Sequence, residues 1–222
     1  MKLNASKSSF LLPTYPGFDF QEALRFLQRS DKESTHVSVG QGVRKMFLFE
    51  ERSYLLECTQ PNTGHLHVHS LNDSLSGDAA RYLESQCIAW LGTVQDPTSF
   101  YAALSGDAIL GPLIQRFRGL PLVGIPDFLE TISWAIIGQQ INLAFAYTCK
   151  QRLVEHYGTR LEFEGQDFYA FPSAAAIAGA DPAILRKYQF SRQKINYLIG
   201  IAQALDRNAN SGNDCLHGLS KS

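Results

Sequence analysis

A short polar turn interrupts an apolar stretch in the middle of the chain and is the first candidate for chemistry. Gly138, Gln139 and Gln140 form this turn, and Asn142 is a good N-cap for the helix that follows. A helix N-terminus offers free N–H groups that suit a phosphate. An ordinary helical hairpin with a solvated polar loop has the same spacing, however, and most such loops bind nothing.

Carboxylates are the second group of residues that could do chemistry, because they can stabilise developing positive charge or activate water. Asp181 stands directly before a proline and is expected to cap a helix. Asp127 and Glu130 lie at the start of an apolar helix, and Asp206 and Asp214 lie at or after the end of the last helix. No motif surrounds any of these acids, so we assign no catalytic carboxylate.

Three histidines alternate along a predicted strand, a pattern that could form a metal site. Strict alternation places His65, His67 and His69 on one face, with Leu66 and Val68 on the other. Imidazoles can bind zinc, but three in a line, about 7 Å apart, fit a tetrahedron poorly. A solvated sheet face is the favoured interpretation, and we expect neither a metal nor another cofactor.

The composition describes an ordinary globular chain without a strong electrostatic signal. The 222 residues carry a formal net charge of −1, and Lys plus Arg equal Asp plus Glu in number from residue 95 onward. Four dispersed cysteines without a C-x-x-C pair, and no signal peptide, indicate reduced thiols and a cytoplasmic protein: Cys58, Cys87, Cys149 and Cys215. No apolar run reaches the 18–20 residues of a membrane span.

The first 94 residues predict an α+β domain. A short helix over 18–30 is followed by four alternating segments that we interpret as strands: 36–40, 43–51, 53–60 and 65–72. An amphipathic helix over 76–93 ends this region. We therefore expect an antiparallel sheet with helices on one side.

Residues 95–222 predict an all-α domain with one small hairpin over 161–171. Helices are expected from 97 to 104, 110 to 117, 128 to 137 and 143 to 157, the last ending at Gly158 as a C′ glycine. Ser173, Asp181 and Ser191 are expected to cap three further helices. Arg192 and Lys194 lie off the apolar stripe of the last helix, where a solvated face is favoured over a phosphate contact.

Three segments carry a resemblance to a known family. The sequence GIPDFLETISWAIIGQQINLAFAYTCKQRLVEHYG, residues 124–158, resembles the signature segment of the bacterial 3-methyladenine DNA glycosylase II family, the alkylation-repair branch of the helix-hairpin-helix glycosylases. The similarity continues through residues 171–205 and reaches back, more weakly, to FDFQEALRFL at 18–27. It covers most of residues 18–206.

The resemblance implies a function in base-excision repair. Such an enzyme flips an alkylated base out of double-stranded DNA, holds the electron-poor ring against aromatic faces and hydrolyses the N-glycosidic bond through an oxocarbenium-like state. Gln140 matches the residue that wedges into the duplex, with Gln139 and Asn142 beside it. Phe26 matches a base-pocket aromatic, although a plain core position is an equal alternative. The family implies no cofactor and a monomer when complete.

The chain departs from the family pattern after Leu205. The family's hairpin, of the type L-x-G-I-G-x-W-T-A, and the catalytic aspartate that follows it have no counterpart there. We expect a C-terminally incomplete glycosylase domain that is inactive alone. The alternative is a non-enzymatic DNA-binding or protein-interaction module. The lesion specificity stays open.

A stability expectation follows from the same departure. The helix over 128–137 is apolar on almost every side and needs several neighbours. We expect it, together with the stripe of Ile195, Leu198, Ile199 and Ala202, to be left partly uncovered, and the chain to self-associate through this surface.

Overall fold

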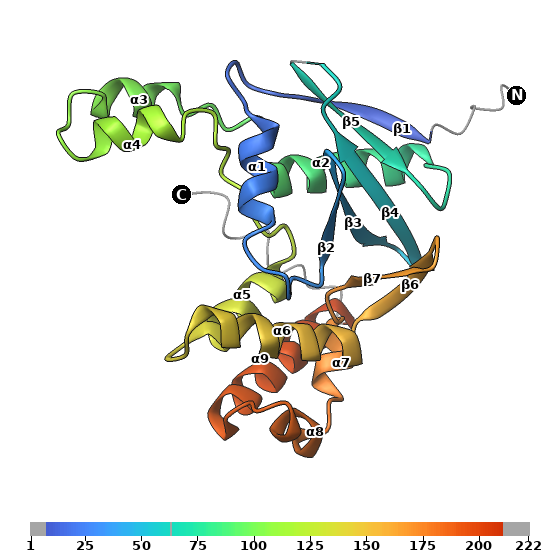
Figure 1. Ribbon diagram of the computed structural model, residues 1–222. Coiled ribbons are helices and arrows are strands. Elements are labelled where there is room, and N and C mark those ends of the chain that lie inside the picture. Colours follow the sequence, from blue (N-terminus) through green and yellow to red (C-terminus); the bar gives the residue numbers. More distant parts are fainter. Residues whose placement is uncertain (1–7, 63, 211–222) are drawn as a thin grey trace, which may run out of the picture. The chain divides into compact units, whose positions relative to one another are not determined.

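The computed structural model describes residues 8–62 and 64–210 (Figure 1). The chain forms two compact units. The first comprises Met1–Asp31, His36–Pro126 and Leu161–Phe168, and the second comprises Lys32–Thr35, Asp127–Arg160 and Tyr169–Ser222. The sequence places a domain boundary after residue 94, whereas the compact units divide after Pro126. Residues 95–126 join the first unit because their backbone bonds to it: Gly119 O accepts from Asp19 N, and Gly124 N donates to Trp90 O.

A five-stranded antiparallel sheet forms the centre of the first unit, in the order β1-β5-β4-β3-β2 (Figure 1). Its strands are β1 (Ser9–Pro13), β2 (His36–Val39), β3 (Gly42–Phe49), β4 (Arg52–Thr59) and β5 (His65–Ser70). The four strands expected from alternation are present. β1 is not predicted from the sequence; it pairs with β5 from Ser9 opposite His69 to Pro13 opposite His65.

Two helices pack on the sheet and bury its apolar face. These are α1 (Phe20–Leu27), capped by Asp19, and α2 (Gly77–Leu91), capped by Ser76. One core cluster joins them to the sheet through side chains from both helices and from β1, β3, β4 and β5: Phe20, Leu24, Leu83, Trp90, Leu12, Phe47, Leu56 and Leu66. The predicted α+β fold class is confirmed.

The helices α3 (Thr98–Leu104) and α4 (Leu110–Arg116) differ from the rest of the first unit because they bury almost nothing. No residue of α3 is buried, and Gly111 is the sole buried residue of α4. Apolar side chains of α3, of α4 and of the segment after α4 border a hollow of about 700 Å³, the α3–α4 groove: Phe100, Tyr101, Leu110, Leu113, Ile114, Phe117, Leu120 and Leu122. The exposed apolar surface of the first unit is therefore concentrated here.

We expect the α3–α4 groove to bind the hydrophobic dye ANS, because an exposed apolar hollow of this size is a site for apolar ligands. Leu113→Gln should reduce the dye fluorescence, since this side chain lines the groove and is 46% exposed. The control is Leu143→Gln, at a leucine that is 59% exposed and lies outside the groove. Equal loss in both variants would mean that the dye does not report on the groove.

The second unit is helical apart from the ends of one strand pair, β6 (Thr159–Phe163) and β7 (Gln166–Ala170), whose middle part, Leu161–Phe168, belongs to the first unit. Its helices are α5 (Phe128–Gly138), α6 (Leu143–Tyr157), α7 (Ala174–Ala178), α8 (Pro182–Lys187) and α9 (Arg192–Asn210). A second core cluster draws on all five helices: Leu129, Ile136, Ile137, Ala146, Leu153, Ile177, Leu185, Ile195, Leu198 and Ala202.

The expectation that α5 and the stripe of α9 are left uncovered is wrong for most of their residues. Ile195, Leu198 and Ala202 are buried, because α9 packs along both α5 and α7. Leu129, Ile136 and Ile137 of α5 are buried as well. The large apolar side chain of α5 that remains exposed is Phe128.

The predicted caps form as expected. Asn142, Ser173 and Asp181 each accept a hydrogen bond from a backbone N–H of the following turn, and Ser191 accepts one from Lys194 N. The prediction that Gly158 is a left-handed C′ glycine is wrong. Its φ of −73° and ψ of 162° are extended. No helix among the described residues is both long and apolar enough to span a membrane.

Candidate nucleic-acid interface

The turn between α5 and α6 presents polar groups to solvent at the start of a long helix. α5 ends at Gly138, and the exposed Gln139 and Gln140 follow it. The Asn142 side chain accepts from Phe145 N at 2.8 Å. The structure therefore places the three predicted DNA-binding residues, Gln139, Gln140 and Asn142, together on one exposed turn, with the N-terminus of α6 beside them.

Gln140 has an unusual backbone conformation. Its φ is +55°, in the left-handed region that side-chain-bearing residues seldom adopt. A non-glycine residue there costs about 1–2 kcal/mol, and such strain is often found at binding sites. With this backbone conformation the chain turns sharply between α5 and α6, and the Gln140 side chain is exposed.

Lys194 supports this turn from α9. Its Nζ donates to Ile137 O at 2.7 Å, and its side chain is half-buried. The sequence predicts a solvated face for both Lys194 and Arg192. That interpretation is wrong for Lys194, which bonds to the last turn of α5, whereas Arg192 is exposed.

Phe26 lies on α1 in the first unit and is 39% exposed. It is absent from the core cluster that the buried residues of α1 form, which argues against a plain core position. The guanidinium carbon of Arg29 lies 4.0 Å from the centre of its ring. One face of Phe26 is thus covered by a cation, and a base could stack only on the opposite face.

Three of the candidate carboxylates have structural roles. Asp127 and Asp181 are N-caps of α5 and α8. Glu130 forms an ion pair inside the second unit. Asp206 lies on α9, and Asp214 lies outside the described residues.

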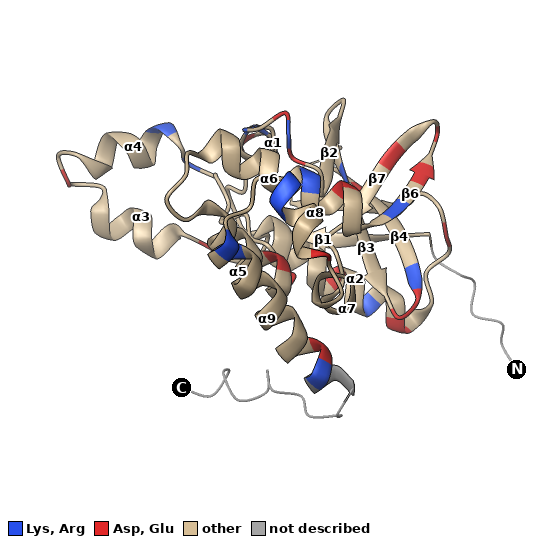
Figure 2. Ribbon diagram, turned by 90° about the horizontal axis from the view of Figure 1, so that it is seen from below, with Lys and Arg blue, Asp and Glu red and all other residues tan. Residues whose placement is uncertain are grey.

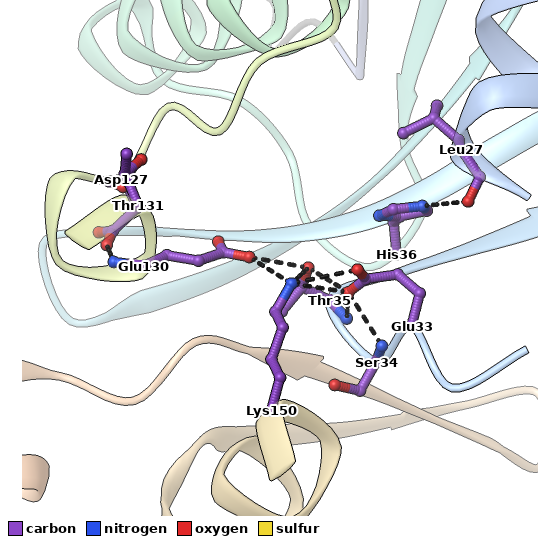
Figure 3. A network of polar contacts seen from close by, with 9 residues as sticks. All are labelled: Leu27, Glu33, Ser34, Thr35, His36, Asp127, Glu130, Thr131 and Lys150. Carbon is purple, nitrogen blue, oxygen red and sulfur yellow. Dashed lines mark hydrogen bonds and ion pairs between the residues drawn. The ribbon is translucent and has the colours of Figure 1, made fainter. Parts of the chain in front are cut away.

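The ion pair of Glu130 belongs to a buried network that the sequence analysis missed (Figure 3). Lys150 of α6 places its Nζ 2.8 Å from Glu130 Oε1 and 2.9 Å from Glu33 Oε1. Thr35 accepts a further bond from Lys150 at 3.3 Å, and the Lys150 ammonium lies 5.5 Å from the centre of the Trp134 ring. The side chains of Lys150, Glu130 and Glu33 are 4%, 4% and 8% exposed.

This network joins α5 and α6 to the segment Lys32–Thr35 within the second unit. Burial alone would lower the pKa of Lys150, but the charges of Glu130 and Glu33 and their hydrogen bonds outweigh it and raise the pKa. Lys150 is therefore a fixed cation rather than a nucleophile. A signal was present in the sequence, because Lys150 interrupts the buried face of α6 between Ala146 and Leu153.

The histidine strand is β5, and its burial alternates as predicted, with Leu66 and Val68 in the core. The rings of His67 and His69 lie 6.3 Å apart and border a hollow of about 590 Å³ with residues of β1. Within residues 8–62 and 64–210, no three His, Cys, Asp or Glu side chains are grouped so that they could hold a metal ion.

Charge is dispersed over the described part of the chain. Basic and acidic residues both occur on many elements in Figure 2, without a basic stripe along α5 or α9. Any attraction to a polyanion must therefore be local, at turns and helix N-termini.

Comparisons with known proteins identify a related family and related proteins. Residues 133–215 match the family described as HhH-GPD superfamily base excision DNA repair protein. A DNA-3-methyladenine glycosylase of Bacillus subtilis is 31% identical over 194 residues, which cover 85% of this chain and 63% of that protein. The chain thus spans less than two thirds of the length of this relative.

Solved structures share the fold. A 3-methyladenine DNA-glycosylase from Archaeoglobus fulgidus superposes with a TM-score of 0.77 at 22% identity, covering 87% of this chain and 66% of that one. An 8-oxoguanine glycosylase/lyase of Clostridium acetobutylicum, solved with double-stranded DNA, has a TM-score of 0.63 at 14% identity, covering 95% of this chain and 66% of that one.

The segment 133–215, which contains the Gln139–Gln140 turn and most of α5, is thus similar to the HhH-GPD superfamily of base excision DNA repair proteins. The particular relatives are of the 3-methyladenine type, so the predicted family resemblance is confirmed.

Proposed function

We propose that the chain belongs to a base-excision DNA N-glycosylase that acts on alkylated bases, and that its second unit inserts the Gln139–Gln140 turn into damaged double-stranded DNA. The observation that carries this proposal is the exposed, strained turn at the N-terminus of α6, within the segment matched to the repair superfamily. The 3-methyladenine type is taken from the named relatives. Action as a monomer in the cytoplasm is part of the proposal.

The proposed recognition has a simple physical basis. An N-alkylated purine is cationic and already a good leaving group, so the protein must chiefly expose and orient it. Gln140 would fill the gap that the flipped nucleotide leaves, and the free N–H groups of α6 would face a backbone phosphate. Phe26 would stack on the flipped base with the ring face that Arg29 leaves open.

Binding tests the wedge directly. Gln140→Ala should weaken binding to a duplex with an abasic site by roughly tenfold, about 1.4 kcal/mol, because the gap in the stack is no longer filled. Fluorescence anisotropy at low salt measures the affinity, with exposed Gln203→Ala on α9 as the matched control. Equal affinities for the wild type and Gln140→Ala would remove the wedge assignment.

Catalysis is tested separately. We expect a polypeptide of residues 1–222 to release no alkylated base, because Asp127, Asp181 and Glu130 are engaged as caps or in an ion pair, and loss of a catalytic carboxylate costs orders of magnitude in rate. Abasic sites would be counted in alkylated duplex DNA after incubation, with the Bacillus subtilis relative as the positive control.

The second candidate function, a DNA-binding module without chemistry, is favoured by the structural roles of those same acids. Damage-selective binding without base release would support it for this polypeptide. Base release well above a buffer control would exclude it and direct attention to Asp206 and Asp214.

A further inference from the structure

The proposed insertion turn directly follows the C-terminus of α5, and the negative end of a helix is repelled by DNA phosphates. The last carbonyls of a helix lack intrahelical partners and give its end a charge of roughly −0.5. Duplex DNA carries one negative charge for about every 1.7 Å of its axis. Bringing Gly138–Ile141 to the duplex therefore brings the negative end of α5 toward phosphates.

Lys194 provides the countercharge for this helix end. Its ammonium donates to Ile137 O at 2.7 Å, within the last turn of α5. Ile137 itself is buried, so its carbonyl belongs to a fixed part of the backbone.

The helix that carries Lys194 is packed into the core of the second unit. The residue after Lys194, Ile195, is buried in the core cluster, as is Leu198 one turn later. α9 packs along α5, and both helices belong to the second unit. The contact thus joins residues 57 positions apart, on two helices that pack against each other.

We propose that Lys194 is a positioning residue, which neutralises the carbonyl end of α5 and holds the strained Gly138–Ile141 turn ready to enter DNA. The inference rests on the proposed function, since it assumes that this turn is the inserting one. Lys194 acts through the turn and need not touch the DNA.

The test combines Lys194 variants with Gln140→Ala in a double-mutant cycle. The duplex carries an abasic site opposite a fluorescent adenine analogue, whose emission rises when it is unstacked by an inserted side chain. Affinity is measured by anisotropy on the same duplex. Circular dichroism melting confirms that each variant is folded.

Lys194→Met should weaken binding roughly fivefold, the size of a cation effect at a helix C-terminus, and should lower the unstacking signal at saturation. Lys194→Arg, which keeps the charge, should retain both. Lys194→Gln, which keeps a donor without the charge, should lose affinity as Lys194→Met does and serves as the second variant if Lys194→Met does not fold. Lys187→Met, at an exposed lysine on α8, is the matched control and should behave as wild type.

The cycle separates positioning from direct phosphate contact. If Lys194 acts through the turn, Lys194→Met adds little once Gln140→Ala is present. Additive losses would overturn the inference, as would wild-type binding and unstacking in both Lys194→Met and Lys194→Gln. A wild-type chain that neither prefers the abasic duplex nor unstacks the probe contradicts the proposed function itself. Loss in Gln140→Ala with full retention in Lys194→Met contradicts only the role of Lys194.

Discussion

Replacing Lys150 with Met is expected to lower the free energy of unfolding by about 3–5 kcal/mol, because the change leaves two buried carboxylates without their counterion. Glu33 and Glu130 are each less than one tenth exposed and lie within 3 Å of the Lys150 ammonium. A domain is stable by only about 5–15 kcal/mol, so the loss is a large share of the total. Urea unfolding followed by circular dichroism measures it.

The control for this variant is Lys187→Met, which removes the same charge from an exposed position and should change stability by less than about 0.5 kcal/mol. Adding Glu33→Gln and Glu130→Gln to Lys150→Met should recover part of the lost stability, because no buried charge then remains. Lys150→Met with wild-type stability would show that the ion network contributes nothing to the second unit.

The same network predicts how stability varies with pH. The raised pKa of Lys150 means that the folded state holds its proton more tightly than the unfolded state, whose lysine has a pKa of about 10.4. Its contribution is therefore fully present below that value and is lost as the pH rises through the folded pKa. Tyr15 in the first unit acts in the same direction, because burial and then the negative groups nearby raise its pKa to about 12. Lys150→Met should flatten the alkaline loss of stability in the second unit.

Gly158→Ala is expected to destabilise the chain by about 1–3 kcal/mol, although its backbone conformation is open to any residue. A Cβ at this position would lie 2.4 Å from Val154 O and 2.5 Å from Ala170 O. Both are backbone atoms, so the end of α6 or the end of β7 must shift. The required glycine is thus explained by close approach rather than by a left-handed C′ position, which corrects the expectation from sequence.

A second glycine provides the matched control for this prediction. Gly200 lies within α9 with open space where a Cβ would be, so Gly200→Ala should stabilise the chain by about 0.5–1 kcal/mol through helix propensity. Thermal and urea unfolding of the two variants should therefore shift in opposite directions. Equal shifts would mean that close packing at Gly158 is not the constraint.

Local features of this chain could be predicted from its sequence. The Asn142 cap, the strands β2 to β5 and the helical hairpin around Gln139 and Gln140 depend on neighbours a few residues away, and alternation or helical spacing records them. The family resemblance is sequence information of the same kind. It indicated the alkylation-repair relatives, but the DNA-contacting roles of Gln139, Gln140, Asn142 and Phe26 remain predictions.

Contacts between residues that are far apart in the sequence could be determined only from the tertiary structure. β1 is a strand because β5, more than 50 residues later, supplies its backbone partners, and Leu12 fills the core. Lys150 meets Glu33 across 117 positions, and the amphipathic pattern of α6 records only that Lys150 lies on the buried face. The cover of the apolar stripe of α9 was wrongly predicted for the same reason, and the α3–α4 groove was not predicted at all. Periodicity shows which side of a helix is apolar, but which surface covers that side depends on how the helices pack.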